Sequence, residues 1–296
     1  MKLGIVGLDC SHAVEFSRMM NDPADKEHIP GHRVTVAWPG SISEDFDMSR
    51  DRMQRFTGQV QALGVTLCDS IEAVMEQVDA VFLEQVDARK RQAQLERILP
   101  FGKPVFVDKP LALSTESAQR IHRMAVRWNC PVMSASSIRY AQGWQAALAR
   151  CQGVVEAVDV YGPMPFTPTQ PGYFWYGVHM AEMLYEALGP GCRWVQAQKE
   201  GGQHLLTASW QGGRLVSIRG MPSEYRNFGG TLMSAGQRFT ADTGSDTKGY
   251  YACLLERILK LFEGGENPVG WDQMLETARF LEAANQSLAA EEKIWL

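Results

Sequence analysis

The chain has 296 residues, of which 45% are hydrophobic and 21% are charged, and its formal net charge is −5. A chain of this length can form one large domain or two ordinary ones. Its mildly acidic composition gives no electrostatic reason to expect nucleic acid or an anionic membrane as a partner. No apolar run approaches the roughly 20 residues that a membrane helix needs. We therefore expect an ordinary globular protein.

The N-terminal residues MKLGIVGL resemble the first strand of a fold more than a signal peptide, because no small-residue cleavage site follows. The six cysteines are scattered and include no Cys-x-x-Cys pair. This cysteine usage predicts reduced thiols in a cytoplasmic protein. Cys10 could join Asp9 and His12 as metal ligands. No partner cluster is visible in the sequence, however, so we expect no metal site.

Residues 1–138 alternate short apolar runs with amphipathic stretches of helical period. The predicted strands are 3–8, 33–38, 65–68, 79–84, 104–110 and 131–136. The predicted helices are 11–22, 47–64, 70–77, 88–102 and 114–129, and Ser70 has the position of a helix cap. This alternation predicts an α/β fold, a Rossmann-type dinucleotide-binding domain with a doubly wound parallel sheet.

Residues 139–296 have a different pattern, which predicts a second domain of α+β class. Predicted strands at 156–162, 204–210, 214–220 and 238–243 are joined by turns, two of which contain paired glycines. Their loose alternation of polar and apolar residues indicates a mainly antiparallel sheet. A helix is predicted at 175–189, before most of these strands, and two more at 250–265 and 271–292 end the chain.

The first strand runs into a glycine turn and a helix, which invites a dinucleotide-binding interpretation. Of the usual three glycines only Gly7 is present, and Asp9 stands where the backbone should approach a diphosphate. Two like charges about 4 Å apart repel by roughly 4 kcal/mol at an effective dielectric near 20, unless Asp9 contacts something else. No carboxylate follows the second strand to hold a ribose. Polar residues that could instead face a 2′-phosphate are Ser41, Ser43, Arg50 and Arg52, although these arginines could equally lie on a solvated helix face.

Asp108-Lys109-Pro110 ends the fifth predicted strand, and the carboxyl ends of parallel strands are where doubly wound sheets bind ligands. The proline keeps the preceding residue extended, which directs the lysine side chain. A lysine in a dry crevice can act as an acid or base. The alternative is a loop lysine without a chemical role.

Two motifs resemble the glucose–fructose oxidoreductase and inositol dehydrogenase family (Gfo/Idh/MocA). The first is the run from Gly102 to Pro110, GKPVFVDKP, in which Asp108 replaces the family's Glu. The second is WYGVHMAE, residues 175–182, in which Gly177 and His179 match the family pattern and Trp175 replaces an Asp. The closing helices are also similar to those of the family, so the resemblance spans nearly the whole chain.

The resemblance implies that Lys109 lies beside the nicotinamide and the substrate, and that His179 helps to move the proton. Cofactor contacts are assigned to Gly7, Asp9, His12, Ser41, Gln85, Asp108 and Pro110. Substrate contacts are assigned to Arg139, Tyr140, Trp175 and Tyr176. Each assignment has a structural alternative. Gln85 could simply form a turn, and Arg139 could have a structural role. His179 and the aromatic run that includes Trp175 and Tyr176 could belong to the core.

The resulting hypothesis is an NAD- or NADP-dependent oxidoreductase that acts on a sugar, polyol or related hydroxy compound. The incomplete glycine motif keeps open a non-redox enzyme on the same scaffold, in which Lys109 and His179 serve elimination or epimerisation. A binding or regulatory module is a third hypothesis, against which the presence of both residues argues. The family resemblance also implies a homodimer or homotetramer.

Overall fold

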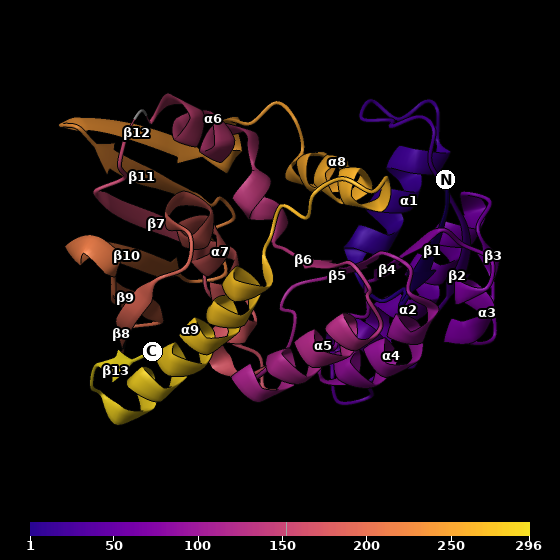
Figure 1. Ribbon diagram of the computed structural model, residues 1–296, viewed down its shortest axis with the longest axis horizontal. Coiled ribbons are helices and arrows are strands. Elements are labelled where there is room, and N and C mark those ends of the chain that lie inside the picture. Colours follow the sequence, from indigo (N-terminus) through magenta and orange to yellow (C-terminus); the bar gives the residue numbers. More distant parts are fainter. Residues whose placement is uncertain (152) are drawn as a thin grey trace. The chain divides into compact units, whose positions relative to one another are not determined.

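The computed structural model describes residues 1–151 and 153–296, which form two compact units (Figure 1). The first unit contains Met1–Ala112, Glu116–Ala135 and Leu254–Val269. The second unit contains Leu113–Thr115, Ser136–Cys253 and Gly270–Leu296. The chain therefore crosses between the units several times.

The first unit is built on a six-stranded parallel sheet with the strand order β3-β2-β1-β4-β5-β6. Its strands are β1 (Lys2–Val6), β2 (Arg33–Trp38), β3 (Thr66–Leu67), β4 (Ala80–Leu83), β5 (Val105–Val107) and β6 (Val132–Ser134). This is the order of a dinucleotide-binding Rossmann fold, in which the connections reverse direction between β1 and β4. The predicted doubly wound parallel sheet is confirmed.

Helices follow most of these strands at the predicted places. They are α1 (Ser11–Asn21), α2 (Asp47–Ala62), α3 (Ile71–Met75), α4 (Arg91–Ile98) and α5 (Thr115–Arg127). The predicted helix 88–102 is α4 with a short 3-10 turn at each end, Ala88–Lys90 and Leu99–Phe101. The Ser70 hydroxyl accepts a hydrogen bond from the Ala73 amide at 3.1 Å, so the predicted cap of α3 is confirmed.

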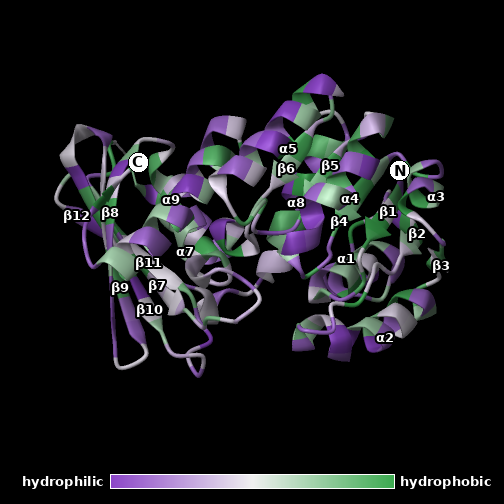
Figure 2. Ribbon diagram, turned by 90° about the horizontal axis from the view of Figure 1, so that it is seen from below, coloured by the Kyte–Doolittle hydropathy of each residue, from purple (hydrophilic) through white to green (hydrophobic). Residues whose placement is uncertain are grey.

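The sheet carries the core of the first unit because strands covered on both faces must be apolar throughout. All residues of β4 and β5 are buried, and Figure 2 shows hydrophobic residues along the strands of this sheet. Phe82 of β4 and Phe106 of β5 pack around Phe16 of α1, with ring centroids 5.4 to 6.3 Å apart. These contacts hold α1 against the strands whose carboxyl ends carry the candidate site.

Helix α8 (Tyr250–Phe262) departs from the predicted division into residues 1–138 and 139–296. From Leu254 onward it belongs to the first unit, where the ring of Phe262 lies 5.1 Å from that of Phe82. The division between the units falls after Ala135, close to the predicted boundary. Periodicity indicates that one face of a helix will be buried, but it does not say which unit buries that face.

The second unit contains a seven-stranded sheet with the order β12-β11-β7-β10-β9-β8-β13. Its strands are β7 (Ala157–Pro163), β8 (Cys192–Glu200), β9 (Gln203–Trp210), β10 (Arg214–Met221), β11 (Gly229–Ser234), β12 (Gln237–Asp242) and β13 (Ile294–Trp295). All neighbouring pairs are antiparallel except β7 and β10, so the mainly antiparallel sheet is confirmed. The prediction did not include β8, β11 or β13.

Three helices complete the second unit: α6 (Gln142–Arg150), α7 (Gly177–Leu188) and α9 (Trp271–Ala290). Helix α7 is buried along almost its whole length. Helix α9 packs against β8, and its Ser287 hydroxyl accepts a hydrogen bond from the Ala197 amide at 2.9 Å. Within the described residues, no helix combines the length and the apolar character needed to cross a membrane.

Candidate active site

The carboxyl ends of β1, β4 and β5 lie side by side because these strands are neighbours in the sheet. The chain leaves β1 through Gly7 and Asp9, leaves β4 through Glu84 and Gln85, and leaves β5 through Asp108 and Lys109. Ligands of doubly wound sheets bind at this edge, where the connections reverse direction. Most of the residues predicted to bind the cofactor therefore lie at this edge.

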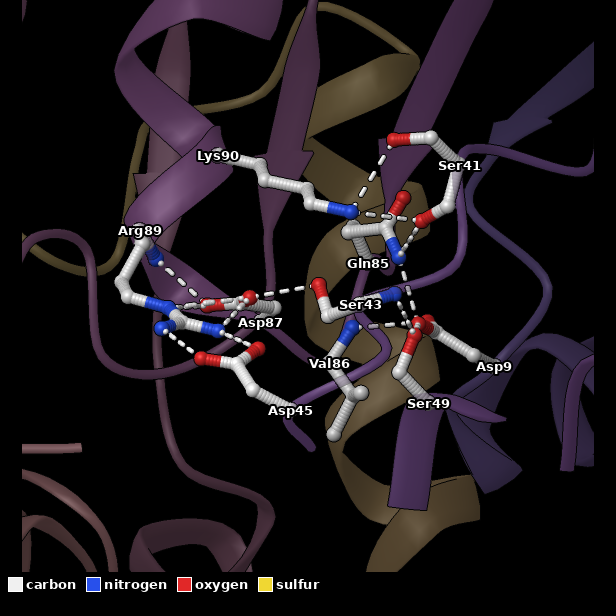
Figure 3. Close-up of polar contacts among 10 residues, drawn as sticks. All are labelled: Asp9, Ser41, Ser43, Asp45, Ser49, Gln85, Val86, Asp87, Arg89 and Lys90. Carbon is white, nitrogen blue, oxygen red and sulfur yellow. Dashed lines mark hydrogen bonds and ion pairs between the residues drawn. The ribbon is translucent and has the colours of Figure 1, made fainter. Parts of the chain in front are cut away.

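Asp9 is fully buried, and its carboxylate is held by three donors (Figure 3). It accepts hydrogen bonds from the Ser49 hydroxyl at 2.6 Å, from the Val86 amide at 2.8 Å and from the side-chain amide of Gln85. Burial raises the pKa of Asp9, and these hydrogen bonds act in the opposite direction. The sequence predicted that Asp9 would repel a diphosphate unless it contacted another group. The structure shows that Asp9 does contact other groups.

The Gln85 side chain extends from the end of β4 toward Asp9 and toward Ser41 in the loop that follows β2 (Figure 3). Its amide nitrogen also donates to the Ser41 carbonyl at 3.3 Å, and its oxygen accepts from Gln94 at 3.2 Å. Gly7 has φ +93°, and a Cβ there would lie 2.6 Å from the Cα of Gln85. Gly40 also faces Gln85, whose amide oxygen fills the place of its Cβ. Both glycines thus permit the close approach of Gln85.

Three of the four residues weighed as contacts for a 2′-phosphate, Ser41, Ser43 and Arg50, have partners within the first unit. Ser43 is buried and donates a hydrogen bond to Asp87 at 2.6 Å. Arg50 lies on the exposed side of α2 and pairs with Asp47 at 2.8 Å and Asp51 at 2.9 Å. These contacts favour the solvated helix face for Arg50. Ser41 is exposed, and its carbonyl accepts a hydrogen bond from Lys90 at 2.7 Å.

A second polar network lies beside the turn and was not anticipated from the sequence. Arg89 donates to both oxygens of Asp87 and forms a two-pronged ion pair with Asp45 at 2.7 Å (Figure 3). Asp87 also caps the 3-10 turn by accepting from the Arg89 amide at 3.0 Å. This network fastens the loop after β4 to the loop after β2.

Four buried side chains converge where β1, β4 and β5 end: Cys10, His12, Glu84 and Asp108. One ring nitrogen of His12, Nδ1, lies 3.0 Å from Asp108 and 3.3 Å from Glu84. Burial raises the pKa of Glu84 to about 6. Burial acts in the same direction on Asp108, but the nearby cationic groups, His12 foremost, outweigh it and hold the pKa of that carboxyl below its usual range. The ring nitrogen Nδ1 of His12 thus lies between two acidic side chains.

Arg91 positions the backbone of the predicted catalytic lysine. Its guanidinium is fully buried and donates to the carbonyls of Lys109, at 3.1 Å, and Pro110. It also lies 3.6 Å from Asp108. The side chain of Lys109 is half-buried. Arg91 was not among the predicted site residues, because an arginine at the start of an amphipathic helix normally faces solvent.

In the second unit, His179 lies in the first turn of α7 and is buried. Its Nδ1 is 2.6 Å from the Ser136 hydroxyl, which also accepts a hydrogen bond from the Ile138 amide. The rings of Tyr176 and Phe228 lie 5.3 and 5.2 Å from the imidazole. The hydroxyl and the two rings orient the imidazole.

Arg139 is fully buried and forms ion pairs with two acids of α7, Glu182 at 3.0 Å and Glu186 at 2.5 Å. Glu182 also accepts a hydrogen bond from the Ser136 amide at 3.1 Å. These contacts favour the structural alternative for Arg139 over a substrate contact, because both acids already engage its guanidinium. The network ties α7 to the turn that carries Ser136.

The aromatic run before α7 is mostly core. Tyr173, Phe174 and Trp175 are buried, and the Tyr173 hydroxyl lies 3.1 Å from the ring nitrogen Nδ1 of His204. Tyr176 is half-buried. Tyr140 is buried, with the Arg139 guanidinium 5.4 Å from its ring centre. Burial favours a place in the core for Trp175, whereas Tyr176 keeps part of its surface exposed.

The parallel sheet and the glycine turn, with Lys109 at the end of β5, define a Rossmann-type dinucleotide-binding scaffold. Residues 1–136 match the Gfo/Idh/MocA model, described as "Oxidoreductase family, NAD-binding Rossmann fold". This match confirms the resemblance inferred from the sequence over residues 1–136. The cofactor class of the family, a nicotinamide dinucleotide, is the predicted one.

Solved structures share the fold over the whole chain. A putative myo-inositol dehydrogenase from Sinorhizobium meliloti aligns with a TM-score of 0.79 at 16% identity, covering 100% of this chain and 99% of that one. A probable dehydrogenase from Thermotoga maritima gives 0.79 at 16%, covering 100% and 98%. Myo-inositol dehydrogenase from Lactobacillus casei, solved with NAD(H) and myo-inositol, gives 0.76 at 15%, covering 100% and 96%. No curated protein sequence matches the chain.

The residues at the glycine turn fit a dinucleotide on one condition. Gly7 keeps the turn free of a side chain, and the carboxylate of Asp9 is occupied by donors of the protein. The amide oxygen of Gln85 fills the space beside Gly40, so a diphosphate placed there needs Gln85 to adopt another rotamer. A glutamine side chain can rotate in this way, at the expense of its hydrogen bonds to Asp9 and Ser41.

Proposed function

We propose that the protein is an NAD- or NADP-dependent oxidoreductase that transfers a hydride to or from a secondary alcohol carbon of a sugar, polyol or related hydroxy compound. The observation that carries the proposal is the position of Lys109. It follows β5 at the ligand-binding edge of the sheet, and buried Arg91 holds its carbonyl. The match of residues 1–136 to an NAD-binding oxidoreductase family supports the same cofactor.

In this proposal the Gly7 turn and the first turn of α1 would hold the diphosphate once Gln85 has rotated, and the residues Asp108, Lys109 and Pro110 would border the nicotinamide. When bound, the nicotinamide supplies the hydride acceptor or donor. Oxidation of an alcohol also requires a base for the hydroxyl proton. Lys109, in its amine form, takes that proton through Nζ. In the reverse direction its ammonium returns the proton to the carbonyl oxygen.

We assign His179 a second role in handling the same proton. The contact between its Nδ1 and the Ser136 hydroxyl orients the ring, so Nε2 is the atom that would donate to the substrate oxygen or exchange a proton with it. Tyr176, half-buried next to His179, is the aromatic residue we propose for contact with the C–H face of a sugar.

Cofactor binding tests the redox proposal directly. The purified protein and its Gln85→Ala variant are titrated with NADH and NADPH while nicotinamide fluorescence is followed. We expect micromolar binding of at least one cofactor, and tighter binding by the variant because no side chain then has to leave the turn. If neither protein binds either cofactor up to millimolar concentration, the redox proposal is wrong.

Activity of lysine and histidine variants tests the roles of Lys109 and His179. Lys109→Ala should lower kcat by at least about 100-fold, the usual contribution of general acid–base catalysis, with an unchanged circular dichroism spectrum. Lys103→Ala, on the same GKPVFVDKP segment but before β5, is the matched control and should keep activity. His179→Ala should lose activity similarly, and full activity with lower stability would assign this residue to the core.

A non-redox enzyme is the second candidate, and the Gln85 side chain, which fills the space beside Gly40, favours it. In that case Lys109 and His179 would remove and return a substrate proton during elimination or epimerisation, without a bound dinucleotide. Exchange of a substrate C–H proton for deuterium, followed by NMR in heavy water without cofactor, distinguishes the two candidates. Exchange that depends on Lys109 would support this alternative.

The proposed substrate class, oligomeric state and cellular location rest on the same family resemblance. The solved relatives include inositol dehydrogenases, which supports a polyol as the substrate class to screen first. A homodimer or homotetramer and a cytoplasmic location also belong to the proposal. Sedimentation of the purified protein and fractionation of cells that express it test these two points.

A further inference from the structure

The cluster of Cys10, His12, Glu84 and Asp108 combines sulfur, nitrogen and oxygen donors in the interior of the first unit. One candidate ligand atom from each of the four lies within 4.8 Å of the other three. The Cys10 sulfur is 3.7 Å from Asp108, and the His12 ring nitrogen Nδ1 lies between the carboxylates of Glu84 and Asp108. None of the four side chains belongs to the Asp9 and Gln85 network.

The hydrogen bonds of the protein do not account for the burial of the Glu84 carboxylate. The residue is 0% exposed, and within residues 1–151 and 153–296 neither carboxylate oxygen forms a hydrogen bond of good geometry. Its polar contact is the one with His12 at 3.3 Å. A buried carboxylate without hydrogen bonds destabilises a fold by several kcal/mol unless another group compensates. A cation bound among the four side chains would provide that compensation.

The donor set indicates which cation this is. Calcium and magnesium take oxygen ligands, whereas a thiolate with an imidazole and carboxylates is a zinc-type set. Arg91 lies 3.6 Å from Asp108. With a thiolate, two carboxylates and a neutral imidazole as ligands, one divalent ion and the Arg91 guanidinium make the cluster electrically neutral. In such a cluster every buried charge is paired or coordinates the ion, which is the condition under which charges are found in protein interiors.

We propose that Cys10, His12, Glu84 and Asp108 bind one divalent transition-metal ion of the zinc class. Bonds of about 2.0–2.3 Å in a tetrahedral arrangement require ligand atoms about 3.3–3.8 Å apart, so small side-chain rotations complete the site. Four protein ligands leave no open position, which is the pattern of a structural ion. The ion joins the start of α1 to the ends of β4 and β5, next to Lys109. The site does not depend on whether a dinucleotide binds.

Metal analysis and cobalt spectroscopy test the site. The untagged full chain, prepared without chelators, is analysed for metal by mass spectrometry, then stripped and titrated with Co²⁺. We expect about one zinc-class ion per chain. We also expect saturation by one equivalent of Co²⁺, with tetrahedral d–d bands and a thiolate-to-cobalt charge-transfer band. Absence of any cobalt spectrum would overturn the proposal.

Matched cysteine variants locate the ion. Cys10→Ser should lose the charge-transfer band, and Cys130→Ser should keep it, because the Cys130 thiol is also buried but donates to the Lys103 carbonyl away from the cluster. Glu84→Gln, which has nearly the same shape, should weaken Co²⁺ binding by at least about tenfold. Circular dichroism confirms that each variant is folded. A band that persists in Cys10→Ser would refute the assignment.

Discussion

Replacing His204 with Phe should make the second unit more stable in mild acid than the natural sequence. His204 lies on β9, is buried, and packs 4.7 Å from the Phe166 ring and 5.4 Å from the Tyr173 ring. Burial, with a smaller effect of the Lys199 charge, lowers its pKa from 6.5 to about 4. The surroundings are aromatic, so a phenylalanine ring suits them, although it removes the contact of Nδ1 with the Tyr173 hydroxyl at 3.1 Å at every pH.

The direction in which stability changes with pH depends on whether the folded or the unfolded chain binds the proton at the higher pH. Above pH 6.5 the imidazole is neutral in both the folded and the unfolded chain, and it has no pH-dependent effect. Between pH 6.5 and about 4 the unfolded chain is protonated while the folded protein is not, so the stability of the folded state falls as the pH falls. The whole interval corresponds to a loss of about 3 kcal/mol.

Urea denaturation, followed by tryptophan fluorescence and circular dichroism at pH 7.5 and at lower values down to about 4.5, measures this effect. Because other groups also titrate, the quantity of interest is the difference in unfolding free energy between His204→Phe and the natural sequence. That difference should shift in favour of the variant by about 2 to 3 kcal/mol over this range. A difference independent of pH would show that His204 is accessible to protons in the folded state.

Two further predictions concern stability. Arg139→Met should destabilise the second unit by about 3–5 kcal/mol in urea denaturation because it leaves the Glu182 carboxylate buried without its cation, and Arg139→Lys should recover part of the loss. Equal stability of the Met variant and the natural sequence would contradict the ion-pair argument. Gly7→Ala should lower the melting temperature sharply, because Gly7 has a positive φ and the added Cβ would overlap the backbone of Gln85. The control Gly58→Ala, on the open face of α2, should be neutral or stabilise the protein by up to about 1 kcal/mol. A Gly7→Ala variant as stable as Gly58→Ala would show that the turn can relax.

Much of the first unit could be predicted from local patterns. Its strands are buried on both faces and are therefore continuously apolar, and its helices carry a clear period, so their order along the chain indicates the parallel sheet. In the second unit the prediction did not include β11, whose first residues are Gly229 and Gly230. A Cβ at Gly230 would lie 2.6 Å from the Asp159 carbonyl oxygen, so these glycines belong to a strand that approaches β7 closely.

The candidate site was only partly predictable. The position of Lys109 after β5 follows from the order of strands and from Pro110. The partners of Asp9 could not be inferred, because Ser49, Gln85 and Val86 are 40, 76 and 77 residues away along the chain. The same is true of Arg91, whose burial under the Lys109 carbonyl depends on where α4 packs.

The sequence alone determined the alternation of strands and helices, the change of pattern near residue 139, and the lysine and histidine motifs, because each is a local or periodic property of the chain. The tertiary structure decided which charged side chains are buried together. It brought Cys10, His12, Glu84 and Asp108 to one point and placed the Gln85 side chain beside Gly40. Such contacts join distant segments through packing, and no local pattern records packing.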